Sequence, residues 1–132
     1  MPNSGVDDLL ARARTGWTRL TATEAYAAVR GGALLVDTRT GSQRARTGDL
    51  PGALVIDRTV LEWRLDPTSP TRIPEAERRP RIVVVCRQGY SSSLAARSLR
   101  DLGLDATDVV EGVGGWIAAG LPMTWEPADV RE

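Results

Sequence analysis

The chain has 132 residues, and four residue types that commonly serve in catalysis or packing are absent or nearly so: histidine, lysine, phenylalanine and cysteine. Without histidine the chain has no Cys–His or Ser–His pair and no zinc site that uses imidazole. All 17 basic residues are arginine, which excludes a lysine Schiff base. The single thiol, Cys86, cannot form a cage of several cysteines around a metal. Chemistry in this chain must therefore use Cys86, carboxylates, hydroxyls, arginines and backbone amides.

The charge and hydropathy patterns exclude several classes of partner. The 17 acidic residues balance the 17 basic ones, so no net charge favours nucleic acid or an anionic membrane. No apolar run approaches the ~20 residues of a membrane span, and the acidic N-terminus has no apolar core typical of a signal peptide. One cysteine allows no internal disulfide, which fits a reducing compartment. We therefore expect a cytoplasmic protein that binds neither nucleic acid nor membrane. The heavy use of arginine and alanine favours a bacterial source.

The length predicts one domain over residues 1–132. We divide it into an N-terminal helix extension (1–16), a core (17–123) and an irregular tail (124–132). Ser4 is a candidate cap for the first helix, and Thr21 with Glu24 matches a capping box for the second. The expected helices are 4–14, 25–30, 59–65, 91–103 and 114–120, the expected strands are 33–37, 50–56, 81–86 and 106–110, and polar loops are expected over 38–49 and 66–80.

Strands separated by helices predict an α/β fold, with a small central parallel sheet of about five strands flanked by helices on both faces. Sites in such sheets form where strands end and helices begin. Cys86 occupies one of these junctions, between the run RIVVVC and the serines at 91–93. The position of the only thiol therefore agrees with a functional site.

The segment after Cys86 has features that stabilise a thiolate. A free thiol has a pKa of about 8.5, and backbone amides, a helix N-terminus and a neighbouring cation all lower it. Gly89 allows a sharp turn and Arg87 adds a permanent positive charge. The same ring of amides would hold an anionic persulfide. The alternative is that Cys86 is a small buried hydrophobe, Arg87 a solvated charge and Ser91 to Ser93 helix caps.

A second thiol chemistry, phosphate ester hydrolysis, also has a sequence pattern. Protein-tyrosine phosphatases use Cys-x5-Arg, usually with histidine before the cysteine. Here Ser92 occupies the arginine position and Val85 precedes Cys86. Both departures count against phosphate hydrolysis.

Five segments, in this order, resemble the rhodanese-like sulfurtransferases over nearly the whole chain, from Leu20 to Pro122. LTATEAYAAVRGG is similar to the opening helix, LLVDTR to the strand with its Asp-x-Arg ending, and GDLPGALVI to the Gly-His-Ile-Pro-Gly-Ala segment. CRQGYSSSLAARSLRDLG resembles the active loop and its helix, and EGVGGWIAAGLP the C-terminal signature. Two positions depart from the family pattern: Asp49 replaces the usual histidine, and Glu111 replaces the first glycine of a Gly-Gly pair.

The resemblance implies a function and a set of site residues. Cys86 would be the nucleophile of a thiosulfate sulfurtransferase, cycling between thiolate and persulfide by a ping-pong route without a metal or organic cofactor. Its partners would be a small anionic sulfur donor and a thiol or protein sulfur acceptor. Asp37 and Arg39 would have a structural role near the site. The loop around the sulfur would consist of Arg87, Gln88, Gly89, Tyr90, Ser91 and Ser92.

The alternative to turnover is a binding or regulatory module on the same fold: a sulfur carrier, a redox sensor or a protein-interaction module. An intact loop around Cys86 disfavours an inactive version but leaves a carrier or sensor open.

Overall fold

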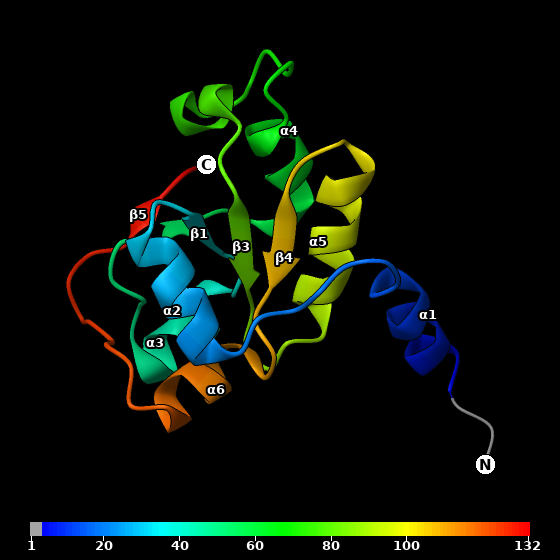
Figure 1. Ribbon diagram of the computed structural model, residues 1–132. Coiled ribbons are helices and arrows are strands. Elements are labelled where there is room, and N and C mark those ends of the chain that lie inside the picture. Colours follow the sequence, from blue (N-terminus) through cyan, green and yellow to red (C-terminus); the bar gives the residue numbers. More distant parts are fainter. Residues whose placement is uncertain (1–3) are drawn as a thin grey trace.

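The computed structural model describes residues 4–132 and contains one five-stranded sheet (Figure 1). All strands are parallel, in the order β4-β3-β1-β2-β5. Their bounds are β1 Leu34–Asp37, β2 Leu54–Val55, β3 Ile82–Val85, β4 Ala106–Asp108 and β5 Asp129–Val130. The prediction of an α/β fold with a parallel sheet of five strands is confirmed.

Helices cover both faces of the sheet, as predicted (Figure 1). Leu61, Ala95 and Leu99 of α4 and α5 belong to the core on one face, and Ala25 and Trp116 of α2 and α6 to the core on the other. The helices are α1 Gly5–Ala13, α2 Ala22–Arg30, α3 Gly41–Thr47, α4 Leu61–Leu65, α5 Ser91–Asp101 and α6 Gly112–Ala118, with short 3-10 turns η1 Arg58–Val60 and η2 Pro74–Arg78. Because helices cover both faces of the sheet, every residue of β1 and β3 is buried.

The capping signals identified the first two helix starts correctly. Ser4 accepts a hydrogen bond from the backbone amide of Asp7 at the start of α1. Thr21 and Glu24 form both bonds of a capping box at the start of α2.

Three expected irregular segments contain regular structure, and one of them, the loop predicted over 66–80, includes the 3-10 helix η2. The loop predicted over 38–49 includes α3, which begins with a second capping box between Thr40 and Gln43. None of its residues is buried, so it has no apolar periodicity for sequence analysis to detect. The tail predicted to be irregular contains β5, whose two residues pair with β2. Both of those residues are exposed, which again removes the apolar signal.

The carboxyl ends of β1, β3 and β4 meet at one edge of the sheet. Asp37 ends β1, Cys86 follows Val85 at the end of β3, and Asp108 ends β4. All three side chains are buried. The topology therefore gathers two carboxylates and the thiol at one edge. No helix among residues 4–132 is long and apolar enough to cross a membrane.

Candidate functional site

Cys86 lies at the bottom of a loop formed by residues 86–91, and only 6% of its surface is exposed. The sulfur accepts hydrogen bonds from the backbone amides of Gly89, at 3.2 Å, and Ser92, at 3.4 Å. The thiol donates to the hydroxyl oxygen of Ser92 at 3.2 Å. Of the amides of residues 87–92 that the sequence offered as donors, those of Gly89 and Ser92 contact the sulfur.

These contacts shift the pKa of the Cys86 thiol. Burial of the sulfur raises the pKa of Cys86, but hydrogen bonding with the hydroxyls of Ser92 and Ser91, together with the hydrogen bonds from the amides of Ser92 and Gly89, lowers it more. The net result is a pKa below that of an ordinary cysteine. Hydrogen bonds that favour the charged form are one of the established ways to shift a pKa. The thiolate is thus more populated at neutral pH than in a free thiol.

The serines after the loop do not cap α5. The N-cap residue is Tyr90, and no side chain caps the helix. The hydroxyls of Ser92 and Ser93 instead each donate to Asp108 at 2.8 Å. Both serines and Asp108 are buried. The interpretation of these two serines as helix caps is therefore wrong. The hydroxyl of Ser92 contacts the sulfur and Asp108 of β4, and that of Ser93 contacts Asp108.

A second layer of side chains, which the sequence analysis missed, supports the loop from below. Arg19 binds Asp108 with two nitrogens, at 2.7 and 3.0 Å, and also donates to the carbonyl of Gly89 at 2.7 Å. Arg14 donates to the same carbonyl at 2.9 Å and to the hydroxyl of Ser93 at 2.9 Å. Asp108 carried a weak signal, a carboxylate at the end of a buried strand. Arg14 and Arg19 carried none, since they lie about 70 residues before the loop.

The first residues of α6 close the loop from another side. The amide of Val113 donates to the carbonyl of Cys86 at 2.9 Å, and that of Gly114 to the carbonyl of Arg87 at 3.1 Å. A Cβ atom at Gly112 would lie 2.3 Å from the carbonyl oxygen of Cys86. Residue 112 must therefore be glycine for the start of α6 and the loop after Cys86 to approach this closely.

Asp37 and Arg39 form a buried ion pair one strand away from Cys86. The guanidinium contacts both carboxylate oxygens, the shortest distance being 2.8 Å. Its remaining donors reach the hydroxyl of Thr47 and the carbonyl of Gly48. The pair thus connects the end of β1 to the end of α3, the geometry that a structural role requires.

The structure shows what surrounds the two residues that depart from the family pattern, Asp49 and Glu111. Asp49 forms an ion pair with Arg44 at 3.2 Å, and its backbone pairs with that of Thr124 in the tail. Glu111 has φ of 63°, a left-handed conformation that glycine adopts more easily. Its side chain is exposed, so the cost of this residue lies in the backbone rather than in packing.

The sulfur opens into a hollow of about 220 Å³, which we call the sulfur mouth. Arg87, Gln88 and Tyr90 are exposed at its rim, whereas Gly89 is buried beneath it. The structure therefore brings the predicted loop residues together around Cys86, and Arg39 also lines the mouth. The residues lining the sulfur mouth are Thr38, Arg39, Gln43, Cys86, Arg87, Gln88, Tyr90 and Ser91.

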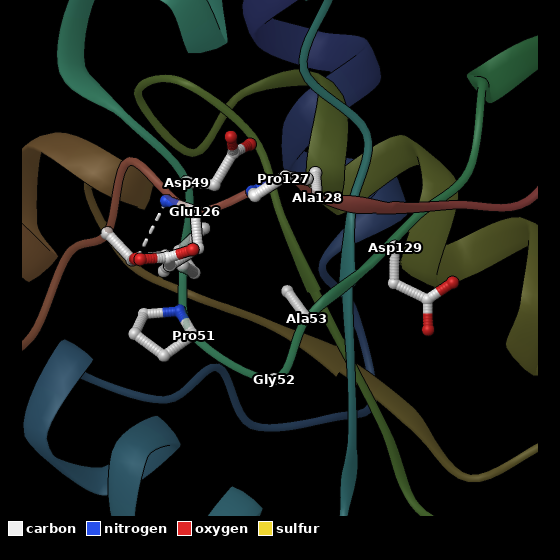
Figure 2. A pocket seen from close by; sticks show the side chains of 10 residues that line it. Asp49, Pro51, Gly52, Ala53, Glu126, Pro127, Ala128 and Asp129 are labelled. Carbon is white, nitrogen blue, oxygen red and sulfur yellow. Dashed lines mark hydrogen bonds between the residues drawn. The ribbon is translucent and has the colours of Figure 1, made fainter.

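A larger hollow, of about 320 Å³, lies elsewhere, between the segment before β2 and the tail (Figure 2). Figure 2 shows Asp49, Glu126 and Asp129 at its walls. Asp49 is paired with Arg44 and Asp129 with Arg131, and the lining contains no thiol. The smaller sulfur mouth, which contains the thiol, is therefore the candidate functional site. Within the described part of the chain, no cluster of three or more histidine, cysteine or acidic side chains is arranged to hold a metal.

Comparisons with known proteins agree with this arrangement. The model of the rhodanese-like domain matches residues 21–119. A protein from Rhodopseudomonas palustris, described as a possible tyrosine phosphatase, is 31% identical in sequence, with a TM-score of 0.82 over 94% of this chain and 99% of its own. A rhodanese-related protein from Thermoplasma volcanium is 23% identical, with a TM-score of 0.68 over 83% of this chain and 100% of its own.

A thiosulfate sulfurtransferase from Pseudomonas aeruginosa shares the fold at 21% identity, with a TM-score of 0.65 over 86% of this chain and 21% of its own. No curated protein matches the sequence significantly. The family match spans the second helix, every strand that bears a site residue and the loop around Cys86. With a solved structure 31% identical over almost the whole chain, it follows that this protein belongs to the rhodanese-like domain family.

Proposed function

We propose that the protein is a sulfurtransferase that moves a sulfane sulfur from a small anionic donor, such as thiosulfate, to a nucleophilic acceptor through a persulfide on Cys86. The observation that carries the proposal is the environment of the sulfur: a thiol with a lowered pKa, two backbone amides aimed at it, and an open mouth above it. A buried packing cysteine needs none of these features.

The reaction divides into two displacements. The thiolate of Cys86 attacks the outer sulfur of thiosulfate, the S–S bond of the donor breaks, and sulfite leaves with the bonding electron pair. The acceptor then attacks the outer sulfur of the persulfide, and the electron pair of the broken S–S bond returns to Cys86. The amides of Gly89 and Ser92 stabilise negative charge on sulfur in both states. Arg87, exposed at the rim, attracts the anionic donor.

The same loop lacks the group that phosphate transfer requires. A buried serine stands six residues after Cys86, and its hydroxyl lies 3.2 Å from the sulfur. An arginine at that position would bind two phosphate oxygens with its planar fork, and a hydroxyl cannot. The name of the Rhodopseudomonas relative makes phosphatase activity an outcome worth measuring.

Intact mass spectrometry after incubation with thiosulfate tests the proposal. We expect the protein to gain one sulfur atom and to lose it, with formation of thiocyanate, when cyanide is added. Cys86→Ser should gain none, because the chain has no second thiol. A wild-type protein that stays unmodified under donor excess would contradict the proposal, and p-nitrophenyl phosphate hydrolysis lost in Cys86→Ser would replace it with phosphatase activity.

A further inference from the structure

A second hollow adjoins the sulfur mouth. Its volume is about 180 Å³, and it shares Arg39, Gln43, Arg87 and Gln88 with the mouth. We call it the side hollow. The four shared residues place the side hollow directly beside the hollow that contains Cys86.

The walls of the side hollow differ from those of the mouth. Residues of α6 form its apolar part: Val113 is buried, Gly114 has no side chain, and Ile117 is 43% exposed. An exposed isoleucine beside a hollow is available to cover the apolar part of a bound molecule. Thiosulfate is a compact dianion and would gain nothing from this wall. The side hollow therefore suits a molecule with a carbon skeleton.

Two arginines give the side hollow its charge preference. Arg46 on α3 and Arg87 in the loop both line it, and neither forms a hydrogen bond or ion pair through its side chain with any residue of 4–132. The third arginine at the hollow, Arg39, is already paired with Asp37. Guanidinium groups bind carboxylates with two parallel hydrogen bonds.

We propose that the side hollow binds the organic part of the sulfur acceptor, and that this acceptor is a small thiol that carries a carboxylate. The inference rests on the proposed sulfur transfer. The carbon chain contacts Ile117, the carboxylate pairs with Arg46, and the thiolate enters the sulfur mouth. There it attacks the outer sulfur of the Cys86 persulfide, becomes a persulfide itself and releases Cys86 as the thiolate.

A matched pair of thiols tests the substrate class. The protein is loaded with thiosulfate, freed of excess donor and discharged with 3-mercaptopropionate or 3-mercaptopropanol, with each rate corrected for the thiolate fraction. We expect the carboxylated thiol to react about fivefold faster at low salt, the effect of one partly solvated charge pair, and the ratio to shrink as salt screens it. A ratio of one or less in the wild-type protein would overturn the inference.

Two variants assign the effect to the side hollow. Arg46→Ala should bring the ratio of the two thiols to about one, whereas Arg12→Ala, an exposed arginine on α1, should leave it unchanged. Each variant is loaded first and its persulfide content measured by mass, so that only discharge is compared. An Arg46→Ala protein with the wild-type ratio would show that the preference arises elsewhere and would remove Arg46 from the site.

Binding without turnover separates this inference from the proposed function. Butyrate has the shape of 3-mercaptopropionate with a methyl group in place of the thiol, and Cys86→Ser cannot be loaded with sulfur. Titration of Cys86→Ser with butyrate should shift the backbone NMR signals of Gly114 and Ile117, and 1-butanol should shift them far less. If these shifts occur and no persulfide ever forms, the proposed sulfur transfer is wrong, but the side hollow does bind a carboxylate. If a persulfide forms and butyrate shifts neither signal, only the inferred binding in the side hollow is wrong.

Discussion

Ser92 contacts the sulfur of Cys86 twice, once through its backbone amide and once through its hydroxyl. The hydroxyl has one proton, which it donates to Asp108 while the thiol is protonated. When Cys86 ionises, that hydroxyl can turn its proton to the sulfur, because Asp108 keeps its bonds from Ser93 and Arg19. Ser92 therefore favours the thiolate without itself changing charge.

Replacing Ser92 by alanine tests this role. Ser92→Ala should slow alkylation of Cys86 by iodoacetamide below pH 7 by about tenfold, since a hydrogen bond to a charged group contributes about 1.5 kcal/mol or more. The midpoint of alkylation against pH should rise toward that of a free thiol. Ser98→Ala is the matched control, because that serine lies on the same helix and donates to Glu62 instead. Equal pH profiles for wild type and Ser92→Ala would show that the amides alone stabilise the anion.

Sequence reasoning found the residues of the site that follow one another along the chain. Cys86 and its loop were recognisable because an apolar strand ends there and a glycine and serines follow. Asp108, Arg19 and Arg14 reach the loop only through the parallel arrangement of β3 and β4 and the packing of α1 on α5. Arg14 and Arg19 contact Gly89 from 70 or more positions away, and Asp108 contacts Ser92 and Ser93 from 16 and 15 positions away, so none of these contacts leaves a local sequence pattern.

At the scale of elements, α1 does more than extend the N-terminus. Leu10 and Ala13 are buried, and two carbonyls at its end accept hydrogen bonds from Arg97 of α5. Arg14, at its C-cap, therefore reaches the carbonyl of Gly89 from a fixed position. Gly89 is the residue whose amide contacts the sulfur. The helix thus helps to fix the position of the Gly89 amide, one of the two amides that donate a hydrogen bond to the sulfur.

Arg14→Ala should loosen the loop while the fold persists. We expect persulfide loading by thiosulfate to slow by about tenfold and the pH midpoint of Cys86 alkylation to rise, because one charged hydrogen bond to the Gly89 carbonyl is lost. Arg14→Lys should recover part of both, and the exposed Arg12 gives the control variant Arg12→Ala. A fall in the urea midpoint with unchanged alkylation would assign Arg14 to stability alone.

Elements were predictable where they bury an apolar face. The strands β1 and β3 are buried at every position and were found within one residue. The α-helix and the strand that were missed, α3 and β5, have no buried residue at all. Hydrogen bonds hold them: α3 begins with a capping box, and β5 pairs with the edge of β2. An apolar pattern cannot report on such elements.

At the scale of the whole molecule, the titratable groups are unusual. The chain has no histidine, and arginines keep their charge at all physiological pH values. Histidine is the side chain that ordinarily changes charge between about pH 5 and 8. The pKa of the Cys86 thiol is lowered toward this range, so we expect its ionisation to control the pH dependence of the proposed sulfur transfer.

The rate of persulfide loading should follow one ionisation. Because the thiolate is the reactive form, the rate should rise once with pH, reach a plateau at a lower pH than for a free cysteine, and show no falling limb near neutrality. Single-turnover loading monitored by mass spectrometry gives the profile. A bell-shaped curve over about pH 5 to 8 would require a second essential group and would contradict a mechanism that uses Cys86 alone.

The close approach of Gly112 to the carbonyl of Cys86 makes the two positions of the family's glycine pair unequal in what they tolerate. A side chain at 111 costs torsional strain of about 1–3 kcal/mol but is exposed to solvent, and this chain has a glutamate there. A side chain at 112 would collide with the backbone of the reactive loop itself. Substitution is therefore tolerated at position 111 but not at position 112. A family member with a residue other than glycine at the second position must have a different loop conformation.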